Sequence, residues 1–127
     1  MTASALAKRA YGTASSSIRT SRGIEYDLFA RTTHQLVQAA RKAKSDFPGL
    51  VKAIHRNRQL WTLLATDVAS EGNGLPADLR ARIFYLAEFT QTHSSAVLRG
   101  EASAAALIEL NAAIMRGLRP AGAGTGR

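Results

Sequence analysis

Residues 46–69 read DFPGLVKAIHRNRQLWTLLATDVA. Its large apolar residues recur every three or four positions, at Leu50, Ile54, Trp61, Leu64 and Val68. That spacing places them on one face of an α-helix. Asp46 is a suitable N-cap, and Pro48 fits a first helical turn, where its missing N–H costs nothing. The stretch therefore predicts an amphipathic helix that buries one face against other helices.

Three further helical segments flank this helix. Toward the N-terminus, the pattern predicts a helix from Ser21 as N-cap to about Lys44. Beyond the turn residues 70–74, a helix is predicted over about 76–99, with Pro76 at its first position and Gly100 as its C-cap. A last helix is expected from near Ser103 to residue 118. No segment has the alternation of a strand, so the fold class is all-α, a compact bundle of about four main helices.

The length predicts a single domain between two tails. Residues 1–20 are expected to be a flexible, basic N-terminal segment, residues 21–118 the helical domain, and residues 119–127 a disordered Pro/Gly tail. The segment 1–22 contains no acid and is rich in Ser, Thr and Ala, a composition shared with organellar transit peptides, but a soluble tail is the preferred interpretation. Within it, Leu6 to Tyr11 could form a helical turn against a partner.

The net charge of +8 raises the question of nucleic-acid binding. Residues 1–22 contribute +4 and residues 119–127 contribute +2, whereas residues 23–118 hold eleven basic and nine acidic side chains. Most of the basic excess therefore lies in the predicted tails, which argues against a dedicated nucleic-acid groove on the folded body. Two local basic clusters keep the alternative open: Arg41, Lys42 and Lys44, and Lys52, Arg56 and Arg58.

No catalytic, cofactor or metal site is predicted. The chain has no cysteine, and His34, His55 and His93 fall on three different predicted helices without a ligand spacing. Glycine-rich phosphate-binding motifs are also missing from the sequence. The longest apolar runs are about five residues, far short of the roughly 20 that a membrane helix needs. We therefore expect a cytoplasmic protein that is not an enzyme and does not insert into membranes.

Three polar residues lie on otherwise apolar faces. Asn57 is central in the 50–68 stripe, Asn111 is central in the stripe of the last helix, and Arg82 adjoins the aromatic side of the 76–99 helix. In one interpretation the two asparagines pair across the bundle or satisfy buried backbone groups. In the other, these residues orient a partner helix in an open groove.

The aromatic residues are open to the same two interpretations. Trp61, Phe84, Tyr85 and Phe89 are core residues by default. The 76–99 helix, however, is apolar over more of its surface than one face of a bundle needs. An exposed remainder would be a protein-binding surface rich in aromatic residues and arginine.

Four stretches together resemble the FlaF family of flagellar biosynthesis proteins, over about residues 20–118. Residues 57–61 are similar to its N-R-x-L-W motif, and residues 20–25 to its small-x-R-x-x-E stretch at the start of the first helix. Residues 75–80, with Ile83 and Phe89, resemble its L-P-x-x-L-R opening of the third helix. Residues 107–118 resemble its L-I-x-x-N-x-x-I-x-x-G-L close.

The chain also departs from the family pattern at several positions. The family commonly has asparagines in the middle of its third helix, where this chain has Arg82, Phe84 and Tyr85, and it often has Arg where this chain has Ala112.

The resemblance implies a helical cytoplasmic factor that binds flagellin before export and acts alongside FlbT in controlling flagellin synthesis. Flagellin ends in amphipathic helices, which an aromatic helical surface can hold in a groove. The residues predicted to contact a partner are Asn57, Trp61, Arg82, Tyr85, Phe89 and Asn111. The alternative is an RNA-binding regulator that acts on flagellin mRNA through the basic N-terminal segment and the arginines of the 46–69 helix.

Overall fold

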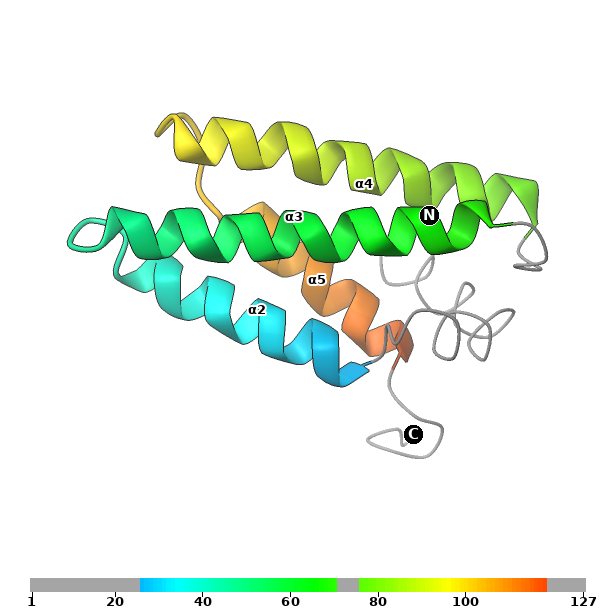
Figure 1. Ribbon diagram of the computed structural model, residues 1–127, viewed down its shortest axis with the longest axis horizontal. Coiled ribbons are helices and arrows are strands. Elements are labelled where there is room, and N and C mark those ends of the chain that lie inside the picture. Colours follow the sequence, from blue (N-terminus) through cyan, green and yellow to red (C-terminus); the bar gives the residue numbers. More distant parts are fainter. Residues whose placement is uncertain (1–25, 71–75, 119–127) are drawn as a thin grey trace.

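The computed structural model describes residues 26–70 and 76–118, which form four helices (Figure 1). These are α2 (Tyr26–Arg41), α3 (Phe47–Ala69), α4 (Ala77–Leu98) and α5 (Ala105–Leu118). The described part of the chain contains no strand. The predicted all-α bundle is thus confirmed. The segments assigned to residues 1–20 and 119–127, and the first helix's expected start at Ser21, lie outside the described residues.

The helices run alternately up and down, with α3 between α2 and α4 (Figure 1). The α5 helix packs along α2 and contacts α4 only slightly. The reason is visible in Figure 1, where α5 diverges from α4 beyond the turn that joins them. The α3 and α5 helices lie diagonally across the core and meet through long side chains.

The core consists of two apolar clusters, one toward each end of the bundle. Trp61 is fully buried in the first cluster and meets the ring of Phe29 edge-on, with 6.1 Å between the ring centroids. Leu36, Ile54 and Leu107 are fully buried in the second. Each such side chain contributes roughly 1.5–3 kcal/mol through burial, so the packing of these faces stabilises the helices far more than their intrinsic propensity does.

A layer of buried polar residues separates the two clusters. In α2, α3 and α4 it lies between the two groups of apolar residues, and in α5 it lies next to Leu110 of the first cluster. The members are Thr32 and Thr33 of α2, Asn57 of α3, Thr90 and Ser94 of α4, and Asn111 of α5.

The helix ends are set by local side-chain and backbone contacts. Asp46 caps α3 as expected, because its Oδ1 accepts a hydrogen bond from the backbone N–H of Gly49 at 3.1 Å. Gly100 has a φ of 77°. Its N–H donates to the Val97 carbonyl at 3.0 Å, and the Glu101 N–H donates to the Ala96 carbonyl at 2.9 Å. This pair of bonds is a Schellman motif, in which Gly100 takes the left-handed position one residue beyond the cap residue Arg99 rather than the cap position itself.

Three boundaries differ from the prediction by one to three residues. The α2 helix ends at Arg41 rather than at about Lys44, and residues 42–45 form a turn. Pro76 stands just outside α4 as its cap residue rather than at the first helical position, because its ψ of 151° is extended. Near the start of α5, the Ser103 hydroxyl accepts from the Ala105 N–H at 3.2 Å, so the helix itself begins at Ala105.

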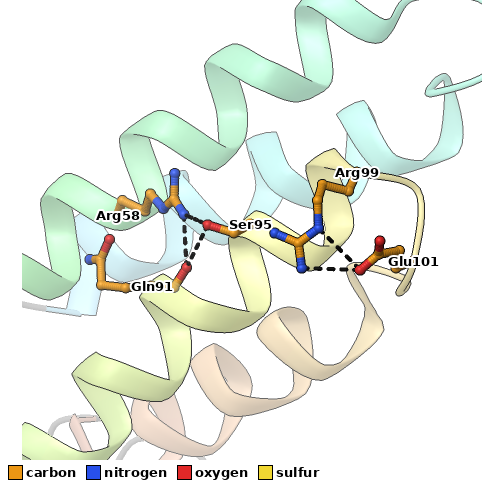
Figure 2. Close-up of polar contacts among 5 residues, drawn as sticks. All are labelled: Arg58, Gln91, Ser95, Arg99 and Glu101. Carbon is orange, nitrogen blue, oxygen red and sulfur yellow. Dashed lines mark hydrogen bonds and ion pairs between the residues drawn. The ribbon is translucent and has the colours of Figure 1, made fainter.

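Arg58 joins α3 to α4. Its Nη2 donates to the backbone carbonyl of Gln91 at 2.8 Å and to the hydroxyl of Ser95 (Figure 2). The guanidinium is therefore part of the helix–helix contact and is not a free surface charge.

Candidate functional site

The two asparagines that interrupt the apolar stripes are hydrogen-bonded to each other. Asn111 Nδ2 donates to Asn57 Oδ1 at 2.7 Å and to Thr33 Oγ1 at 3.1 Å. Asn111 Oδ1 accepts from the indole Nε1–H of Trp61 at 2.9 Å. Because an indole N–H can only donate, it determines which side of the Asn111 amide faces it, and hence the direction of the whole chain of bonds.

All four members of this network are inside the bundle. Asn57, Trp61 and Asn111 are 0% exposed, and Thr33 is 8% exposed. Of the two interpretations of the asparagines, the structure shows the first, in which they pair across the bundle. Three of the six predicted partner-contacting residues are thus brought together as part of the core.

The polar layer is not fully satisfied. Within the described part of the chain, Asn57 Nδ2, Thr90 Oγ1 and Ser94 Oγ have no hydrogen-bond partner. A buried polar group without a partner lowers stability compared with an apolar one. The layer therefore determines how the four helices align more than it adds to their stability.

The other three predicted residues lie on α4, away from this network. Tyr85 is 70% exposed, and Arg82, one turn earlier, is also exposed. Phe89 is half-buried, and its ring stacks on that of His93 with 5.2 Å between the centroids. We call the face formed by Arg82, Tyr85 and Phe89 the α4 outer face. It is the only group of predicted site residues that a partner could reach without opening the bundle.

Phe84 extends the exposed aromatic surface toward α3. It is 41% exposed and borders a shallow hollow of about 540 Å³ between α3 and α4. Phe84 is one of the aromatic residues noted in the sequence, but it was not among the residues predicted to contact a partner. The sequence signal that could have identified Phe84 was its position one residue before Tyr85. That position directs the Phe84 ring away from the α4 outer face but does not place it in the core.

Two more exposed apolar residues were not predicted. Phe47 is 49% exposed and Val51 is 40% exposed, both at the start of α3. They precede and flank the Leu50 position of the apolar stripe, so the helical period alone could have identified them as lying off the buried face.

Residues 26–70 and 76–118 contain neither a metal-ion site nor a membrane-spanning helix. No group of three His, Asp or Glu side chains there is arranged to hold a metal ion. No helix in the same residues is long and apolar enough to cross a bilayer.

Comparison with known protein families gives a match over most of the chain. Residues 7–118 match the family described as flagellar protein FlaF. The chain belongs to the FlaF family. The match begins at residue 7, inside the segment 1–20 that the sequence analysis set apart from the helical domain. No curated protein and no solved structure matches the chain.

The motif residues Asn57, Trp61 and Asn111 build the buried network, so this part of the family resemblance reflects how the bundle is held together. The departures Arg82, Phe84 and Tyr85 are all exposed on α4. The motif residues of the resemblance thus lie in the core. Of the four departures noted from the sequence, three are exposed on α4 and the fourth, Ala112, is half-buried on α5.

Proposed function

We propose that this flagellar protein binds flagellin before export, through the α4 outer face, and thereby helps to control flagellin synthesis in the cytoplasm. The observation that carries the proposal is an aromatic surface on α4 that the bundle does not bury: Tyr85 is 70% exposed. Aromatic residues and arginine are the side chains most often responsible for binding energy at protein interfaces.

The shape of this face suits an amphipathic helix. Arg82, Tyr85 and Phe89 follow three- and four-residue spacing along α4, so they form a strip that a second helix can lie against. The terminal helices of flagellin have an apolar face that stays without its final partner until the filament assembles. Covering that face would prevent premature assembly. The role requires no catalysis, and we propose that the protein is not an enzyme.

The proposal is tested by calorimetry with the full chain and its cognate flagellin. We expect measurable binding, and the absence of heat at roughly 50 µM of both proteins would overturn the proposal. Tyr85→Ala should weaken binding. Phe47→Ala is the matched control, because it also removes an exposed ring but at the other end of the bundle.

Regulation of flagellin mRNA by direct RNA binding is the second candidate function. The exposed residues Arg41, Lys42 and Lys44 favour it. Arg58, one of the arginines predicted to contact RNA, instead binds Gln91 and Ser95 within the bundle. RNA binding would fall steeply with salt and would be lost when residues 1–22 are removed. A direct contact with FlbT is a further proposal, which co-purification of the two proteins would test.

A further inference from the structure

The end of the bundle opposite the α4 outer face carries a second accessible surface. An apolar hollow of about 510 Å³ lies between the turn that joins α2 to α3 and the turn that joins α4 to α5. Its lining includes Ala40, Ala43, Leu50, Val97, Ala104 and Ile108. We call it the end groove. Val97 is twelve residues beyond Tyr85, or about 18 Å along the helix, so the two surfaces are separate.

The edge of the end groove adds exposed apolar area. Phe47 lines the groove and is 49% exposed, and Val51, one turn further along α3, is 40% exposed. Several floor positions are alanines, whose small side chains let another helix approach closely. A groove with a small-residue floor and a large exposed ring at its edge fits a helix better than an extended chain.

One rim of the end groove is positively charged. Lys44 lines the groove, and Arg41 and Lys42 are exposed in the same turn. Between residues 28 and 66 the only acid is Asp46. Its carboxylate already accepts the hydrogen bond from the Gly49 N–H. Asp46 keeps its negative charge in that bond and offsets one cation, so three basic side chains and one acid leave this rim with a net charge of +2.

The opposite rim is neutral. Arg99 and Glu101 form an ion pair there, with 3.0 Å between Nη2 and Oε1 (Figure 2). Glu109 is exposed one residue beyond Ile108 and does not line the groove. The charge of the end groove is thus one-sided, which restricts the partners that fit it.

We propose that the end groove binds one amphipathic helix of a partner protein, with apolar residues in the groove and acidic residues along the edge that faces Lys44. The two features are independent of each other: the apolar lining selects an apolar stripe, and the basic rim selects acids on one flank. This partner is distinct from the one that we propose for the α4 outer face, and both could be bound at once.

Charge argues against the other occupants that the chain itself could supply. Residues 1–25 contain four basic side chains and one acid, and residues 119–127 contain two basic side chains and no acid, so both ends are repelled by the rim. A second copy docked symmetrically through the same groove would bring the two basic rims together. Among the lining side chains only Lys44 and Ser103 could donate to a phosphate backbone, and the others are apolar, which disfavours nucleic acid.

The test uses two synthetic helical peptides and the full chain. Both peptides carry leucines at helical spacing, and one flank is glutamate in the first peptide and lysine in the second. Binding is measured by fluorescence anisotropy and located by amide chemical shifts. We expect the glutamate peptide to bind at least about tenfold more tightly and to shift residues of both turns.

Matched variants locate the contribution of each feature. Phe47→Ala should weaken binding of the glutamate peptide roughly tenfold, and Phe84→Ala, the control, should leave it unchanged. Lys44→Glu should weaken binding of the glutamate peptide about fivefold. Arg82→Glu, which reverses a charge on the α4 outer face instead, should leave this binding unchanged. Circular dichroism of each variant verifies the fold.

Several outcomes would overturn the proposal. These are equal binding of the two peptides, no binding of either, shifts confined to α4 residues 82–89, or a dimer that Phe47→Ala dissociates. Tighter binding of single-stranded RNA, lost in Lys44→Glu but unchanged in Phe47→Ala, would make nucleic acid the occupant instead. Flagellin binding that depends on Tyr85 but not on Phe47 would leave the proposed function standing in each of these cases.

Discussion

The indole of Trp61 donates a hydrogen bond to the side-chain oxygen of Asn111, 50 residues away in the sequence, at 2.9 Å in the centre of the bundle. Asn111 also donates to Asn57 and Thr33, so the hydrogen bonds of this one side chain connect α2, α3 and α5. The bond between Trp61 and Asn111 links α3 to α5, the last helix of the bundle, and it is the basis for the first prediction.

Replacing Asn111 by alanine should lower the free energy of unfolding by about 2–4 kcal/mol. The substitution leaves the Trp61 N–H and the Asn57 oxygen buried without a partner, and it opens a small cavity. Urea denaturation followed by circular dichroism measures the change. Gln59→Ala, on the exposed side of α3, is the control and should stay within roughly 0.5 kcal/mol of the natural protein. Equal effects of the two would contradict the role assigned to the network.

The two threonines of the polar layer should respond in opposite directions to valine. Thr33 Oγ1 accepts from Asn111, whereas Thr90 Oγ1 has no partner among the described residues. Thr33→Val should therefore cost about 1–3 kcal/mol, and Thr90→Val should be neutral or stabilise by about 1 kcal/mol. Thermal unfolding of the two variants side by side checks this. A destabilised Thr90→Val would mean that its hydroxyl has a partner after all.

Gly49→Ala should remove the cap of α3. A Cβ at this position would stand 2.5 Å from Oδ2 of Asp46, so the carboxylate must move away from the Gly49 N–H. We expect a loss of about 0.5–2 kcal/mol, similar to that of Asp46→Ala. The double variant should cost little more than either single variant, because both remove the same bond. Full additivity in chemical denaturation would show that the two residues act separately.

Gly100→Ala should destabilise the protein by about 1 kcal/mol for a backbone reason alone. A Cβ added at Gly100 meets nothing within 4 Å, but the φ of 77° is unfavourable for a residue with a Cβ. Gly100→Asn should be milder, since asparagine tolerates this conformation better than alanine does. We expect a higher melting temperature for Gly100→Asn than for Gly100→Ala. The reverse order would contradict the backbone explanation.

Tyr85→Ala and Phe89→Ala should both weaken flagellin binding without loss of helical circular dichroism. Tyr85 is 70% exposed, so its replacement should leave the free energy of unfolding within roughly 0.5 kcal/mol of the natural value. Phe89 packs partly against the core and on His93, so a modest loss of stability is expected as well. An unfolded Tyr85→Ala would contradict the exposed position of this ring.

The helices themselves were predictable from the sequence because their causes are local. Apolar residues at helical spacing, Asp46 before Pro48, and Gly100 after the 76–99 segment each act within a few residues of their own position. Membership in the FlaF family was also predictable from the sequence, because the motif residues can be compared in order along the chain.

Which side chains meet each other was decided by the tertiary structure. The sequence shows that Asn57 and Asn111 each interrupt an apolar stripe, but two interpretations fitted that pattern until α3 and α5 were placed across one core. The same holds for the exposed aromatic residues: α4 is apolar on several sides, and only the positions of α3 and α5 determine that Tyr85 stays outside.

The end groove had no signal in the sequence, because its walls come from two turns more than 50 residues apart and its charge comes from one of them only. Local periodicity determined the four helices of this protein; long-range packing decided which of their faces are core and which are available to partners.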